Sequence, residues 1–183
     1  MKPESQAFTA DDMPAFTREL VLVEAQAIIR RIRQADARLR ELAASVPETG
    51  PSGQGEWNAK EVLAHIAVFS RGWGALGYLV ASGRVKELKV ADVISQRDTL
   101  GEEMVQRPVA EILQEIEAQH GKTITFLERA TVEQLLRTYK QEFGESTAEQ
   151  IFRLPVTAHL EQHLDQLERA LSRDGSATTK PAP

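Results

Sequence analysis

The spacing of the apolar residues constrains the fold of this chain more than any other feature of its sequence. From Asp11 to Val46 such residues recur at alternating steps of three and four, which is the spacing of one face of a long amphipathic helix. The members of this stripe are Val21, Ala25, Ile28, Ile32, Ala35, Leu39, Leu42 and Val46. No segment alternates with period two over the length of a strand, so the sequence predicts an all-α fold.

A second and a third helix are predicted from end signals that flank further apolar stripes. Asn58 and Glu61 have the spacing of a capping box, and Gly83 can end the helix that they begin. Pro108 suits the first turn of the third helix. That helix should end before a short helical turn near Thr131–Leu136.

The last predicted helix contains a proline. Ser146 and Glu149 have the spacing of a capping box that begins it, and Pro155 interrupts its apolar stripe. Because proline lacks a backbone donor, it should kink the helix about one turn before His159. The tail, residues 174–183, is small and polar, and we expect it to be disordered.

Four helices that each have one apolar face are expected to form a four-helix bundle, here as a single domain over residues 1–173. Residues 84–107 have mixed charge and weaker periodicity, and form a long, partly helical crossover between the second and third helices. This crossover is long enough to let the third helix run parallel to the second. The helix order would then depart from a simple up-down-up-down arrangement.

Composition excludes several classes of function. The 183 residues include no cysteine, which rules out disulfides, thiolate metal sites and a cysteine nucleophile. A net charge of −5 argues against a general nucleic-acid binder, which needs a clustered basic surface. The apolar runs are too short to cross a membrane, and the first residues lack the apolar stretch of a signal peptide. We therefore expect a cytoplasmic protein that does not contact membranes.

Three of the four histidines are expected to point inward. His159 and His163 lie four apart on one face of the last helix, and His65 lies on the inward side of the second helix. A single histidine on an apolar face is more often a hydrogen-bonded core or rim residue than a ligand. However, three buried imidazoles need partners, and one divalent ion would satisfy them together. The residues alone leave both interpretations open.

The segment HLEQH differs from the zinc-protease helix motif. In that motif the glutamate directly follows the first histidine, whereas here Glu161 lies two residues after His159. That spacing turns Glu161 to the far side of the helix. A protease of this type is therefore excluded.

Two motifs resemble the DinB/YfiT-like superfamily of damage-inducible and thiol-transferase-like proteins. They are WNAKEVLAHIAVF, from Trp57 to Phe69, and AHLEQHLDQL, from Ala158 to Leu167. The resemblance implies a four-helix bundle in up-down-down-up order, often dimeric. It also implies that His65, His159 and His163 bind zinc, nickel or a similar divalent ion such as manganese or iron.

Three further residues are candidates for the surroundings of this site. His120 also lies on an apolar stripe, and we interpret it as a core or pocket residue, because the resemblance gives it no ligand role. Trp57 is expected to be a core anchor, with a pocket wall as the alternative. Glu61 either serves the helix N-terminus or orients an imidazole.

Three protein ligands leave a coordination position for water or substrate, which is typical of a catalytic metal site. The first hypothesis is a metal-dependent enzyme acting on a small molecule. The resemblance suggests that it uses a low-molecular-weight thiol in transferase, isomerase or hydrolase chemistry. The alternative is a non-catalytic binding or stress-response module with a structural or vestigial metal, and a third hypothesis is an interaction protein without metal.

Apolar residues beside the first stripe further predict a homodimer: Leu20, Leu22, Ile29 and Leu42.

Overall fold

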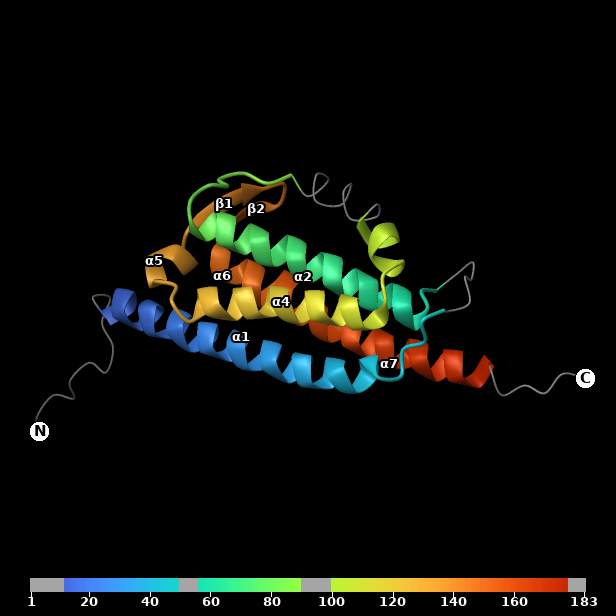
Figure 1. Cartoon of the computed structure of the whole chain (residues 1–183). Helices are drawn as coiled ribbons and strands as arrows, with labels where there is room; N and C mark the ends of the chain where they lie inside the picture. The colour runs from blue at the N-terminus through green and yellow to red at the C-terminus, as the bar shows by residue number, and fades with distance from the viewer. Residues whose placement is uncertain (1–11, 50–55, 90–99, 178–183) are drawn as a thin grey trace, which may run out of the picture.

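The computed structural model of the chain is mostly helical, and it describes residues 12–49, 56–89 and 100–177 (Figure 1). Its long helices are α1 Met13–Ala43, α2 Ala59–Ala81, α4 Val109–Leu127 and α7 His159–Ala177. Helix α2 packs against both α4 and α7, and α1 packs against the same two helices. Their apolar faces therefore share one interior. Across the described ranges, no helix is long and apolar enough to cross a membrane.

The predicted capping signals around α2 are confirmed. The Asn58 side chain accepts a hydrogen bond from the Glu61 N–H at 3.0 Å, and the Glu61 carboxylate accepts one from the Asn58 N–H at 2.8 Å. Gly83 follows the helix with a φ of +77°, a left-handed conformation that favours glycine. Pro108 precedes α4, and the short turn of helix α5, Val132–Leu135, lies where the sequence predicts it.

The prediction of an all-α fold holds for most of the described residues, but the sequence did not reveal a short β-hairpin. Strands β1, Thr138–Gln141, and β2, Gly144–Thr147, form an antiparallel hairpin, and Gly144 has a φ of +122° where β2 begins. Each strand has four residues, too few to give a recognisable period-two pattern. The crossover contacts this hairpin: the Leu88 N–H donates to the Lys140 carbonyl at 2.9 Å. Residues 100–105, also in the crossover, are helical.

The start of the last helical stretch also differs from the prediction. Ser146 lies in β2, and the capping box is formed by Thr147 and Gln150 at the start of α6, Ala148–Ile151. Pro155 lies in a π-helix, η2 Phe152–Ala158, instead of at a simple kink. Within η2 the Thr157 hydroxyl donates to the Phe152 carbonyl at 2.6 Å.

The end of the chain is helical further than expected. Helix α7 continues to Ala177, beyond the predicted domain end at residue 173. The rest of the expected disordered tail, residues 178–183, lies outside the described residues.

The interior contains two apolar clusters along the length of the helices. One includes Leu39, Leu63, Ile112 and Leu164, and the other includes Ile28, Val80, Leu135 and Phe152. Three buried polar residues, Asp36, Ser70 and His120, come from α1, α2 and α4. The first cluster is the one beside which α2 and α7 bring the histidines together.

Candidate metal centre

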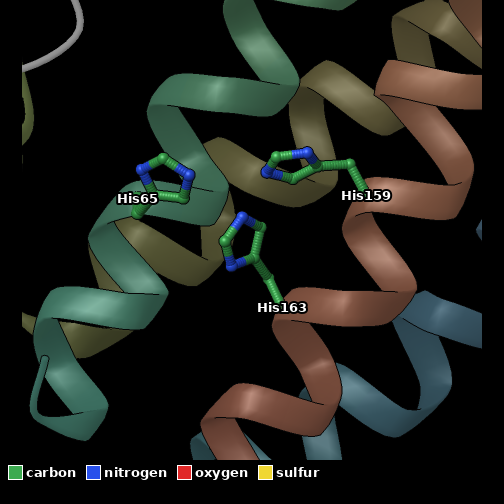
Figure 2. A group of neighbouring side chains, drawn as sticks. All are labelled: His65, His159 and His163. Carbon is green, nitrogen blue, oxygen red and sulfur yellow. The ribbon is translucent and has the colours of Figure 1, made fainter. Parts of the chain in front are cut away.

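The side chains of His65, His159 and His163 point toward a common space between two helices (Figure 2). His65 comes from the second turn of α2, whose start is fixed by the Asn58 cap. His159 is the first residue of α7 and His163 lies one turn later. Helices α2 and α7 pack directly against each other, which is what brings the distant sequence positions together.

The three imidazole rings are close enough for a nitrogen of each to bind one common ion. One ring nitrogen from each histidine lies within 4.8 Å of the others. The ring centroids are 4.2 Å apart for His159 and His163, 4.4 Å for His65 and His163, and 6.1 Å for His65 and His159. His65 is buried at 8% exposure, while the other two are half-buried. The group therefore lies near the protein surface without being fully exposed.

This donor set fits a divalent first-row metal. Bonds of about 2.0–2.1 Å to imidazole nitrogen let one ion bridge nitrogens up to about 4 Å apart. The separations here, all within 4.8 Å, need only small ring rotations to reach that distance. Imidazole suits zinc, nickel, copper and iron, and a set without sulfur or carboxylate does not favour calcium or magnesium.

Gln166, which was not among the predicted site residues, orients one of the rings. The His163 Nδ1 atom lies 2.8 Å from the Gln166 Oε1 atom. Because an amide oxygen can only accept, Nδ1 carries the hydrogen, and Nε2 is the nitrogen whose lone pair can bind a metal. The Nε2 atoms of His159 and His163 are both shielded from solvent. The H-x-x-Q spacing on α7 was the signal that could have identified this residue.

Aromatic rings form the wall of the site. The Phe69 ring lies parallel to that of His159, with centroids 4.1 Å apart and planes 15° apart. The Trp57 ring lies 4.6 Å from that of His65 and 6.4 Å from that of His163. Trp57 is 39% exposed, so the expectation that it is a core anchor is wrong, and it lies at the rim of the histidine cluster. It precedes the α2 cap, which leaves it outside the packed helix interface.

The remaining candidates lie outside the cluster. Glu61 completes the α2 capping box, which confirms the prediction that it serves the helix N-terminus. Glu161 points away and forms a bidentate pair with Arg31 of α1, at 2.7 and 2.8 Å. His120 is fully buried and bonds to Asp36 and Ser70 instead of joining the other histidines.

Comparison with known families shows the family of this chain. A family model described as the DinB superfamily matches residues 27–167. Because the match covers most of the chain, this protein belongs to the DinB superfamily. Neither the curated proteins nor the solved structures gave a significant match.

Proposed function

We propose that this protein is a metal-dependent enzyme whose ion is held by His65, His159 and His163. The observation that carries the proposal is the convergence of three imidazoles from two helices, with ring nitrogens within 4.8 Å of one another. Membership of the DinB superfamily supports it. Three ligands from the protein leave room for a water or a substrate atom, as catalytic sites require.

A bound divalent ion would lower the pKa of a coordinated water or thiol toward neutrality. Zinc or nickel is the expected metal, with manganese or iron as alternatives. The chain itself contributes the three nitrogen donors, the Gln166 carbonyl that fixes one tautomer, and the rings of Trp57 and Phe69 that limit access of water. The substrate class that we propose is a small electrophile that reacts with a low-molecular-weight thiol, in transferase, isomerase or hydrolase chemistry.

One observation favours a second candidate function. Trp57, Phe69 and Gln166, which lie against the three histidines, have side chains that neither take up nor release protons at neutral pH. A non-catalytic module that binds a small molecule, with a structural metal, would need no general base there.

Two measurements on untagged protein separate these functions. Mass spectrometry of the purified protein should find close to one first-row metal ion per chain, and His163→Ala should lose most of it. A protein that stays metal-free when zinc or nickel is offered contradicts both functions. Consumption of a low-molecular-weight thiol in the presence of electrophilic test substrates should then depend on the metal. Full metal occupancy without such turnover would favour the binding module.

The proposed metal site is part of a helical bundle whose helix order we also propose. We propose a four-helix bundle in up-down-down-up order, with the crossover between α2 and α4 allowing those helices to run parallel. The contacts of α2 with α4 and α7, and of α1 with the same pair, support this arrangement. It places the α2 and α7 histidines on adjacent helices.

A further inference from the structure

A second concave site lies between α2 and α4, with Phe152 of η2 at its base. Its volume is about 1020 Å³, at the upper end of the range of small-molecule pockets. None of its lining residues comes from α7, so it is separate from the histidine cluster. On α2 it is lined by Arg71, Gly74, Ala75 and Tyr78, which follow one another at helical spacing.

Small residues on α2 produce the hollow. Gly74 and Ala75 project little or no side chain into it. A Cβ atom at Gly74 would lie 2.8 Å from the Thr123 Oγ1 atom, and one at Gly77 would lie 2.5 Å from the Phe152 ring. These glycines therefore allow Thr123 of α4 and Phe152 of η2 to approach α2 closely.

The groove has an aromatic surface. The rings of Tyr78 and Phe126 meet edge to face with centroids 5.5 Å apart, and Phe126 lies 5.6 Å from Phe152. Tyr78 is 44% exposed, so part of this aromatic row is open to a ligand. Flat apolar groups pack well on such rings.

The charged residues of the groove are mainly cationic. Arg71, Lys122 and Arg129 line it, against the single carboxylate of Glu115, in a chain with a net charge of −5. Within the described residues, neither Arg71 nor Arg129 takes part in an ion pair, whereas Arg31 and Arg38 are paired with acidic side chains of α7. Arginine is well suited to carboxylate and phosphate groups because its planar fork can donate two parallel hydrogen bonds.

We propose that the α2–α4 groove binds an organic anion that carries a flat apolar group, with the ring against Tyr78 and Phe126 and the anionic group at Arg71 or Arg129, the arginines on either side of those rings along the groove. A carboxylate and a phosphate share the required chemistry. The proposal does not depend on the metal centre, because the two sites have no lining residue in common.

The test is a titration of the ¹⁵N-labelled full chain followed by nuclear magnetic resonance. The probes are 2-naphthoate and 1-naphthyl phosphate, with 2-naphthol as the neutral match and 1-naphthylmethylamine as the cationic match. We expect saturable shifts of amide signals around Gly74–Tyr78 and Lys122–Arg129 with at least one anion, at least tenfold tighter than with the neutral or cationic probe. A comparison of the two anions identifies the preferred head group.

Two variants locate the binding. Ala75→Trp should fill the groove and weaken anion binding at least tenfold, whereas Ala37→Trp, at an exposed position on α1, should not. Arg71→Glu with Arg129→Glu should also abolish the preference for anions, with Arg30→Glu as the charge control. Thermal melting confirms that each variant is folded. The proposal is overturned if neither anion binds, if the neutral probe binds equally well, if the shifts fall elsewhere, or if folded Ala75→Trp binds like the wild type.

Discussion

The His120 Nδ1 atom lies 2.5 Å from the Asp36 Oδ1 atom, a contact that joins α4 to α1 inside the protein. On the other side of the same ring, Nε2 lies 2.9 Å from the Ser70 Oγ atom of α2. Since a carboxylate accepts, Nδ1 donates to Asp36, and Nε2 shares a hydrogen bond with the Ser70 hydroxyl. The exposed fractions are 1% for His120, 3% for Ser70 and 8% for Asp36. One imidazole thus satisfies buried polar groups on two other helices.

His120→Ala should destabilise the fold without removing the metal. The change leaves the Asp36 carboxylate and the Ser70 hydroxyl buried without their hydrogen-bond partner, at a cost of roughly 2–4 kcal/mol. Denaturant unfolding should therefore shift to a lower midpoint at an unchanged slope. Metal content, measured on the folded variant, should stay at the wild-type level. An unchanged midpoint, or loss of the metal from folded protein, would contradict this role.

Gln166→Ala should weaken metal binding while leaving the fold intact. The Gln166 carbonyl holds the His163 ring in the tautomer that presents Nε2, and losing such an orienting contact typically weakens metal affinity 10- to 100-fold. Competition with a chromophoric chelator measures this change. Gln162→Ala is the matched control, because Gln162 is an exposed residue on the same helix. Equal affinities in the two variants would show that the contact has no orienting effect.

Removal of the metal should lower the melting temperature, and more so at pH 7.5 than at pH 5. Ligation requires neutral imidazole, so binding depresses the pKa of the ligand histidines in the folded state. The stabilisation is then full above their unfolded pKa of about 6.5 and is lost as the pH falls below it. Melting curves with and without a strong chelator, recorded at both pH values, test this. His159→Ala should show no chelator effect at either pH, and a wild type that behaves the same way would leave the site without thermodynamic support.

Glu149→Gln should make the protein more stable relative to wild type as the pH rises. Burial raises the pKa of Glu149, whose side chain is 12% exposed; Arg153 at 3.0 Å opposes the shift, and Glu24 adds to it. A carboxyl whose pKa is raised on folding favours the fold below its unfolded pKa and loses that contribution as the pH rises through its folded pKa. The difference in unfolding free energy should therefore grow between about pH 4 and pH 7. A difference that is constant over this range would show that Glu149 is not destabilised by burial.

The first helix should mediate a homodimer. Met13, Phe16, Leu20 and Val23 are 47%, 43%, 50% and 56% exposed, and their spacing puts them on one outward stripe of α1. Of the residues that first suggested a dimer, Leu20 and Leu22 are exposed, whereas Ile29 is buried and Leu42 packs, partly buried, against the core. Light scattering at micromolar concentration should give twice the 20.3 kDa of the chain, and Phe16→Glu with Leu20→Glu should halve that mass. A wild-type mass near 20.3 kDa would contradict the dimer.

The sequence predicts the helices and the histidine cluster because both depend on local spacing. Apolar residues that recur at steps of three and four lie on one face of a helix. His159 and His163 are four residues apart, so they lie on one face of their helix whichever helix packs against it. The hairpin was missed because Tyr139 is the single fully buried residue of its two strands, so no alternation is visible. The position of Trp57 at the rim depends on how α7 packs beside α2, and no local pattern carries that information.

The sequence does not predict the buried hydrogen bonds of His120, for a related reason. Asp36 is 84 residues away from it in the chain, and nothing in the spacing on α1 distinguishes this aspartate from a solvated one. The groove likewise depends on Gly74 of α2, which faces Thr123 of α4. Such pairings between distant helices depend on their relative rotation, which the periodicity of either helix leaves undetermined.

The π-helix η2 ends directly before His159, so it sets the rotation of α7 about its own axis. In an α-helix each residue adds about 100° of rotation, so deleting one residue from 152–158 would turn everything downstream by about that angle if the rest stayed in place. Both histidines of α7 would then face away from His65, although every side chain of the cluster would still be present in the sequence. The length of this seven-residue segment therefore determines the direction in which the histidines of α7 point. Insertions or deletions within it should be tolerated far less well than substitutions.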